Sequence, residues 1–217
     1  MDSFLQRLFH DQVWTQCKFA TFAYDDLVER IPTLNAEKGP SEEVQALAGL
    51  PLNQLIAESG ESASERALRI WCPIQSFLAA TANISKILWG SDPAVSSARS
   101  PLRQALKVSD ASPLRSRNLR ENFEQFDARI DTWWGCSSTH GFVDMNFEHL
   151  ATVMEGLPEE QVFRDMDLYT GDVVFWGQRY NLPSLNIEIR RVMAMALRGA
   201  AGQLSDFGTA SSEEHGR

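Results

Sequence analysis

The sequence predicts a mainly α-helical fold, an antiparallel helical bundle that carries one β-hairpin between its last two long helices. Apolar residues recur at helical spacing through most of the chain, and capping-box patterns stand before two of these stretches. One later segment changes to β-branched and aromatic residues around a glycine-containing turn, which is typical of a hairpin. A chain of 217 residues is long enough to fold without disulfide support. We therefore expect one domain over residues 1–204 and a flexible polar tail over 205–217.

The first long helix is predicted to begin at Ser3, because Ser3 and Gln6 form a capping-box pair. Apolar residues then follow at helical spacing as far as Ile31. Proline cannot donate a backbone hydrogen bond, so Pro32 is expected to end this helix. A short helix is expected to begin at Pro40.

The next long helix is predicted to open at a second capping box, Ser62 and Glu65, and to run to about Trp89, where Gly90 ends it. Two adjacent faces of this helix are apolar, which is too wide for a surface helix and places it near the middle of the bundle. Pro73 lies inside the first turns and removes one hydrogen-bond donor there.

Two further helices are expected before the hairpin. A connecting helix should cover about 91–107. The helix after it is expected to open at Ser112 and Pro113, an N-cap followed by a proline at the first helical position. It should continue to Trp134, because Gly135 would end it.

The hairpin is predicted over about 162–176, with a glycine turn near its middle. A hairpin alone is only marginally stable, so its aromatic side should pack on helices. A last helix is expected from Ser184 to about Arg198, where Gly199 and Gly202 would end it.

The net charge of −9 argues against a general nucleic-acid coat. Six basic residues are nevertheless gathered in one strip, 99–120, against the single acid Asp110, a local net charge of +5. Such a strip could dock a phosphate backbone or the acidic face of a partner protein, or it could be a solvated or internally salt-bridged surface. The six residues are Arg99, Arg103, Lys107, Arg115, Arg117 and Arg120.

Motifs for metal and cofactor chemistry are missing from the sequence. It contains no glycine-rich nucleotide loop, no P-loop and no zinc-protease motif. Four residues within 140–149 could ligate a metal, but no two of them are histidines three or four residues apart. We therefore expect no metal and no cofactor. The four are His140, Asp144, Glu148 and His149.

The sequence shows no sign of export or of membrane insertion. An acid, Asp2, stands where a signal peptide would carry a basic region. The longest apolar run, 192–197, is too short to cross a bilayer. We expect a cytoplasmic protein with no membrane partner.

The strongest functional signal lies in the segment 117–134, which carries one apolar stripe between two polar shoulders. Arg120 and Glu124 are spaced to pair on this helix. A helix at the edge of a bundle would show the same pattern without any further function. The stripe consists of Leu119, Phe123, Phe126, Ile130 and Trp133.

This segment resembles the motif helix of HEPN-type proteins, helical bundles in which an arginine is followed after four to six residues by a histidine. It is more similar still to a group of uncharacterised bacterial helical proteins with an Arg-Asn-His-Phe-Glu-His-Phe-Asp-x-Arg-like run. Gln125 stands where the motif histidine would be, and the similarity is specific over about 20 residues. The residues that match the run are Arg120, Phe123, Glu124, Phe126, Asp127 and Arg129.

In active members of the wider family, arginine and histidine from two paired subunits are thought to cleave RNA without metal, so the resemblance implies a homodimer. Arg120 would stabilise phosphate charge, whereas Gln125 cannot exchange a proton near neutral pH. The loss of acid–base help typically lowers a rate by about 10²–10⁴-fold. The resemblance therefore implies a non-catalytic protein, active in RNA-associated or stress- and defence-related binding.

Two other functions remain open. One is a metal-independent ribonuclease in which Arg120 acts with Gln125, Asn122 or Asp127. The other is a helical scaffold whose basic strip binds an acidic protein. For RNA binding, the phosphate contacts are expected from Arg115, Arg117 and Arg120.

Overall fold

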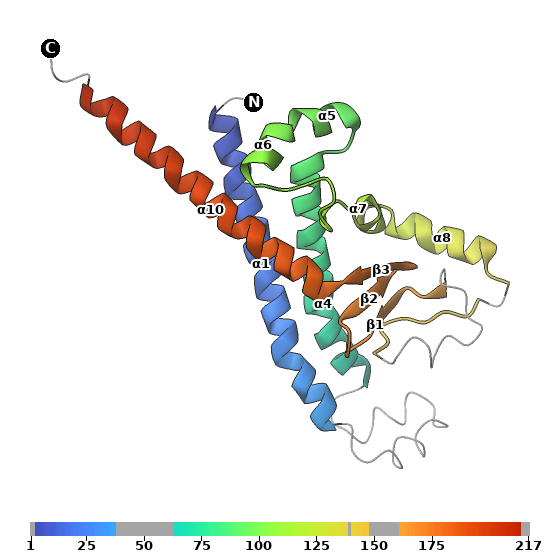
Figure 1. Ribbon diagram of the computed structural model, residues 1–217. Coiled ribbons are helices and arrows are strands. Elements are labelled where there is room, and N and C mark those ends of the chain that lie inside the picture. Colours follow the sequence, from blue (N-terminus) through green and yellow to red (C-terminus); the bar gives the residue numbers. More distant parts are fainter. Residues whose placement is uncertain (1–2, 38–62, 139, 148–160, 214–217) are drawn as a thin grey trace. The chain divides into compact units, whose positions relative to one another are not determined.

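The structure, a computed structural model, describes residues 3–37, 63–138, 140–147 and 161–213 (Figure 1). These residues form a mainly helical fold with one small three-stranded antiparallel sheet before the last long helix, which confirms the predicted fold class. Of the helices described here, none combines the length and the apolar character that crossing a membrane requires.

The chain divides into two compact units, each assembled from segments that are distant in the sequence. Unit 1 consists of Met1–Thr21, Leu78–Phe126 and Leu182–Arg217, and unit 2 consists of Phe22–Phe77 and Asp127–Asn181. The expectation of one domain over 1–204 stays a prediction.

Helix α1 spans Ser3–Glu37 and begins where the capping box predicts. The predicted end at Pro32 is wrong, because the helix continues through this proline. A proline inside a helix removes one backbone hydrogen bond, and the turns on either side can retain theirs. The short helix expected from Pro40 lies outside the described residues.

Helix α4 spans Ala63–Trp89, as predicted, and contains Pro73. Its two apolar faces are buried from Ile70 onward. Burial on two faces means that the helix has neighbours on two sides, which agrees with a central position in a bundle.

Gly90 ends α4 with a φ of 66°, a left-handed conformation that glycine adopts readily. Its N–H donates to the Lys86 carbonyl at 2.8 Å. A Cβ at this position would lie 2.2 Å from Cγ1 of Val95, so the close approach of the next segment also requires glycine.

Two short helices, α5 (Pro93–Ala98) and α6 (Ser100–Ala105), replace the single connecting helix that was expected. The side chain of Asp92 caps α5 by accepting a hydrogen bond from the Val95 N–H at 2.9 Å. The second helix restarts with Pro101 in its first turn, where a proline fits because no N–H is needed.

Helix α7 spans Arg117–Glu124, so the predicted start at Ser112 is wrong. The Ser112 hydroxyl donates to the Glu188 carboxylate at 2.8 Å instead. Ser116 takes the N-cap position and accepts a hydrogen bond from the Leu119 N–H at 3.2 Å.

The predicted continuous helix is interrupted at Gln125, which has φ −123° and ψ 32°. Helix α8 follows over Phe126–Cys136 and passes Gly135, where an end was expected. No glycine or proline marks the break. The break falls beside the boundary between units 1 and 2, which lies between Phe126 and Asp127.

The sheet of unit 2 consists of β1 (Arg164–Met166), β2 (Asp172–Phe175) and β3 (Gln178–Asn181) in that order. Strands β1 and β2 confirm the predicted hairpin. The third strand was not expected, and it follows a tight turn in which Trp176 and Gly177 both have positive φ.

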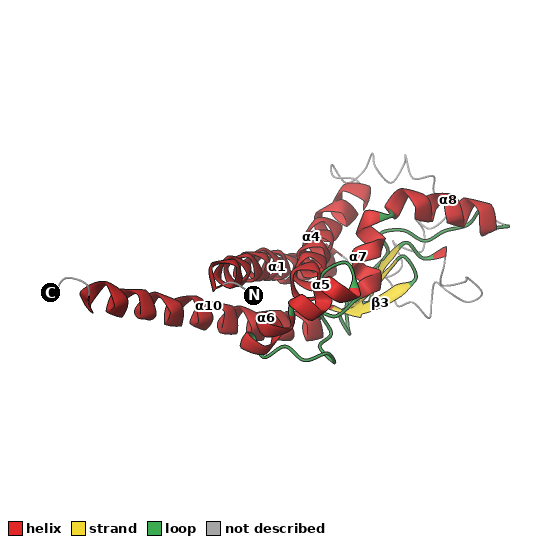
Figure 2. Ribbon diagram, turned by 90° about the horizontal axis from the view of Figure 1, so that it is seen from above, coloured by secondary structure: helices red, strands yellow, loops and turns green. Residues whose placement is uncertain are grey.

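Helix α8 lies beside the sheet region within unit 2 (Figure 2), and aromatic side chains connect the two. The ring of Trp133 meets that of Phe163 edge-on, with centroids 5.2 Å apart. Phe163 also lies 4.3 Å from Trp176, measured between ring centroids. The expected packing of the hairpin's aromatic side on a helix is therefore present.

Helix α10 spans Leu182–Glu213, so the predicted end at Gly199 and Gly202 is wrong, and 205–213 are helical. Gly199 allows close packing in unit 1 because it has no side chain. A Cβ there would lie 2.6 Å from the ring of His10, which means that α1 and α10 approach closely at this point.

Candidate functional site

The last turn of α4 leaves backbone carbonyl groups without helical partners, and arginines from the strip 99–120 bind them. Arg99 Nη1 donates to the Ile87 carbonyl at 3.1 Å, and Arg103 Nη1 donates to the Leu88 carbonyl at 2.8 Å. Because the helix dipole places partial negative charge at this end, the two cations also stabilise it electrostatically. Part of the basic strip therefore has a structural role.

Arg120 makes a third contact of this kind from α7. Its Nη1 donates to the Gly90 carbonyl, and its Nε is buried without an acceptor in the described part of the chain. The predicted pair between Arg120 and Glu124 is wrong, because Glu124 forms an ion pair with Lys86 of α4. Lys86 of α4 takes the place of Arg120 as the partner of Glu124. The Arg120 side chain instead contacts the C-terminal end of α4.

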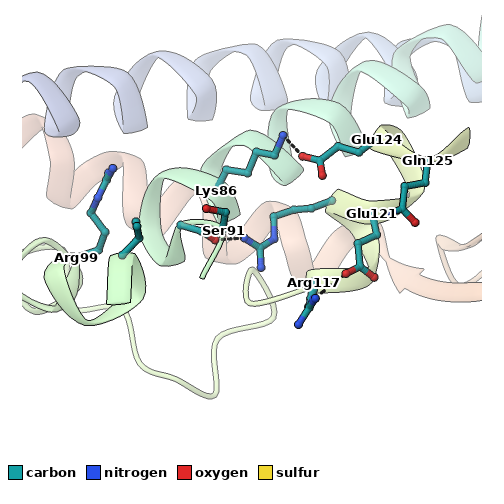
Figure 3. Close-up of a pocket in the computed structure, with 10 residues that line it drawn as sticks. Lys86, Ser91, Arg99, Arg117, Glu121, Glu124 and Gln125 are labelled. Atoms are coloured by element: carbon teal, nitrogen blue, oxygen red, sulfur yellow. Dashed lines mark hydrogen bonds and ion pairs between the residues drawn. The ribbon is translucent and has the colours of Figure 1, made fainter. Parts of the chain in front are cut away.

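A pocket of about 530 Å³ opens beside these arginines, entirely within unit 1 (Figure 3). It lies at the meeting point of the C-terminal end of α4, helix α5 with the Arg99 that follows it, and α7. Its lining residues are Lys86, Gly90, Ser91, Val95, Arg99, Arg117, Arg120, Glu121, Glu124 and Gln125.

Two of the four cations in the pocket are neutralised within it. Lys86 pairs with Glu124, and Arg117 Nε lies 2.6 Å from Oε1 of Glu121 (Figure 3). All four side chains are at least about one-third exposed, so each pair contributes little to stability. The two pairs nevertheless determine the net charge of the pocket, because each carboxylate offsets the charge of one cation.

Arg99 and Arg120 have no carboxylate partner among the residues that the structure describes. The guanidinium of Arg99 lies over the Phe9 ring, with Cζ 3.6 Å from the centroid. Burial lowers the pKa of Arg99, but an arginine remains charged at neutral pH. The pocket therefore holds two positive charges that no acid in its lining offsets.

Gln125 lines the pocket from the bend after α7, and its side chain is exposed. Its backbone N–H donates to the Glu121 carbonyl at 2.9 Å, which fixes the bend. The amide can donate and accept hydrogen bonds, but it cannot carry a proton to or from a substrate near neutrality.

Arg117, Arg120 and Gln125 are thus the predicted site residues that the structure brings together in one pocket. Asn122 is fully buried, so its amide cannot reach a substrate. Asp127 lies exposed in the first turn of α8 and does not belong to the pocket lining.

Arg115 also lies outside the pocket, where its Nη1 is 3.3 Å from the Asp110 carboxylate. Both side chains are more than half exposed. This pair agrees with the alternative that part of the strip is internally salt-bridged. The strip is therefore not one uniform binding surface.

Sequence reasoning missed Lys86, Ser91 and Glu121 as members of the site. A basic residue in the last turn of a helix stabilises the C-terminal end electrostatically. Because Gly90 is predicted to end α4, Lys86 could have been expected near that end. Ser91 carried no signal of its own, because only the fold brings it to α7.

The arrangement is suited to holding an anion. Arginine offers several N–H donors in a planar fork that matches the oxygens of a phosphate or carboxylate. No histidine is present among the residues that line the pocket, so it offers no group that titrates near neutral pH. No model of a known protein family, no curated protein and no solved structure matches this chain.

Proposed function

We propose that this chain is a non-catalytic RNA-associated binding protein that holds a phosphate group of RNA in the pocket of unit 1. The observation that carries the proposal is the pair of arginines, Arg99 and Arg120, without a carboxylate partner in the described residues. Charge-assisted hydrogen bonds from arginine are among the strongest contacts that a protein makes to phosphate.

The proposal of a non-catalytic role rests on the position of Gln125. The resemblance to HEPN-type proteins would require a histidine here, and an amide cannot replace its proton transfer. The two carboxylates of the pocket, Glu121 and Glu124, are engaged by Arg117 and Lys86.

Binding of a fluorescent single-stranded RNA, followed by anisotropy, tests the proposal. Arg120→Ala should weaken binding by about tenfold or more, because a hydrogen bond to a charged group contributes about 1.5–3 kcal/mol. Affinity should also fall with added salt, as phosphate contacts require.

Arg103→Ala is the matched control. Arg103 also binds two backbone carbonyls, that of Leu88 in the last turn of α4 and that of Ser96 in α5, at 2.8 Å each, but it does not line the pocket. It should lower the melting temperature and leave RNA affinity unchanged. Equal losses of affinity in both variants, or no binding by the unaltered protein, would contradict the proposal.

The same RNA samples, examined on a denaturing gel, decide between binding and cleavage. We expect the RNA to remain intact. Cleavage that disappears in Arg120→Ala would replace the proposal with a metal-independent ribonuclease. The homodimer that the family resemblance implies is tested by light scattering of the same preparation.

A further inference from the structure

We propose that the pocket selects a phosphomonoester dianion, such as a phosphorylated RNA end or a free nucleotide, over the phosphodiesters within an RNA chain. This inference rests on the proposed function, because it names the kind of phosphate that the same site takes. Two observations support it: the charges of the residues that line the pocket, and the contacts that hold its two unpaired arginines in place.

The first step concerns charge. Four cations and two acids line the pocket, and both acids are paired, which leaves the charges of Arg99 and Arg120. A phosphomonoester carries a charge of about −1.5 to −2 at pH 7, whereas a phosphodiester carries −1. A dianion therefore matches the unpaired charge of the pocket, and a diester leaves part of it unmatched.

The second step concerns the surroundings of the two free cations. Glu121 and Glu124 stand in the α7 wall of the pocket, as Figure 3 shows. A continuous RNA chain would bring further phosphates towards these carboxylates, and like charges repel. A terminal phosphate has further phosphates on one side only, so the acids disfavour a diester within the chain more than an end.

The third step concerns how the arginines are held. Arg99 and Arg120 each use Nη1 to bind a backbone carbonyl, of Ile87 and Gly90 respectively. Stacking on Phe9 holds the guanidinium of Arg99 further. Their remaining N–H groups are therefore positioned before a ligand arrives, which reduces the entropy lost on binding.

The test compares RNA oligonucleotides of one sequence that carry a 5′-phosphate, a 5′-hydroxyl or a 3′-phosphate, with adenosine 5′-monophosphate as a competitor. We expect a phosphorylated end to bind about tenfold more tightly than the hydroxyl end. The preference should shrink below about pH 6, where the phosphomonoester takes up a proton and the arginines do not.

Variants assign the preference to the pocket. Arg120→Ala and Arg99→Ala should remove the preference, whereas Arg103→Ala should retain it. Glu124→Gln frees Lys86 from its ion pair and keeps the shape of the side chain, so it should tighten binding of every phosphate by a fewfold. This variant tests the pocket by a gain of affinity, so its result does not depend on removing an arginine that also binds a carbonyl at the end of α4.

The outcomes separate this inference from the proposed function. Equal affinity for phosphorylated and hydroxyl ends, with both weakened in Arg120→Ala, overturns the inference and leaves RNA binding in place. Direct binding of adenosine monophosphate, measured by calorimetry, without binding of any RNA supports the phosphomonoester and overturns the RNA function. Binding of none of these probes overturns both.

Discussion

Gly199→Ala tests the close approach of α1 and α10 in unit 1. Within a helix, alanine is favoured over glycine by about 1 kcal/mol. The new Cβ, however, would lie 2.6 Å from both Cε1 and Nδ1 of His10, far inside contact distance. His10 is only 2% exposed, so its ring has little room to move, and overpacking a filled site costs about 1–3 kcal/mol. We expect a net loss of about 1 kcal/mol in the free energy of unfolding.

Gly135→Ala is the matched control, because Gly135 is also helical and a Cβ added to it would meet nothing within 4 Å. It should raise stability by up to about 1 kcal/mol. Thermal unfolding followed by circular dichroism compares the two variants with the unaltered protein. If both substitutions raise the melting temperature, the close packing at Gly199 is refuted.

A double-mutant cycle assigns the loss to the imidazole. His10→Ala removes the ring, so Gly199→Ala in that background should become stabilising. An equal loss with and without the ring would show that another contact of α10 is responsible.

Three further predictions concern pH and catalysis. Burial lowers the pKa of His10, and the Ala196 backbone and Asp11 oppose this only in part, so the folded state resists protonation. Stability should fall as the pH is lowered through the ordinary titration range of histidine, and His10→Gln should reduce this dependence. Hydrogen bonds from Arg191 lower the pKa of Glu188. The contribution of the Glu188 carboxylate to folding stability is therefore present at neutral pH and is lost as the pH falls through its folded-state pKa. Glu188→Gln should lower the free energy of unfolding by about 1 kcal/mol at pH 7 and by less in acid. Gln125→His supplies the imidazole of the motif and should raise RNA cleavage by about 10²-fold, and a gel showing no cleavage above background would separate this pocket from the family mechanism.

The long helices could be predicted from the sequence because their signals are local. Apolar spacing and capping boxes marked α1 and α4, and Gly90 marked the end of α4. Strand β3 was missed because Gln178–Asn181 contains one apolar residue and follows a turn with Trp176 at positive φ, which is unusual for a bulky side chain.

The site was only partly predictable for a different reason. The spacing of Arg120 and Glu124 suggested a pair within one helix, but Lys86, 34 positions earlier than Arg120, takes the carboxylate. The acceptor of Arg120 is a backbone carbonyl, and sequence patterns of side chains do not reveal such partners. Gly199 was misread for a similar reason, since a glycine that ends a helix and one that admits a neighbouring ring look alike in sequence.

The arginines at the end of α4 link the stability of that helix terminus to whatever enters the pocket. An anion bound by the remaining N–H groups of Arg99 and Arg120 leaves their hydrogen bonds to the carbonyls of Ile87 and Gly90 in place. Thermodynamic reciprocity then requires that, because the held arginines favour the ligand, the bound ligand in turn stabilises the terminus. Amide hydrogen exchange in the last turn of α4, measured with and without nucleotide, would report this coupling directly.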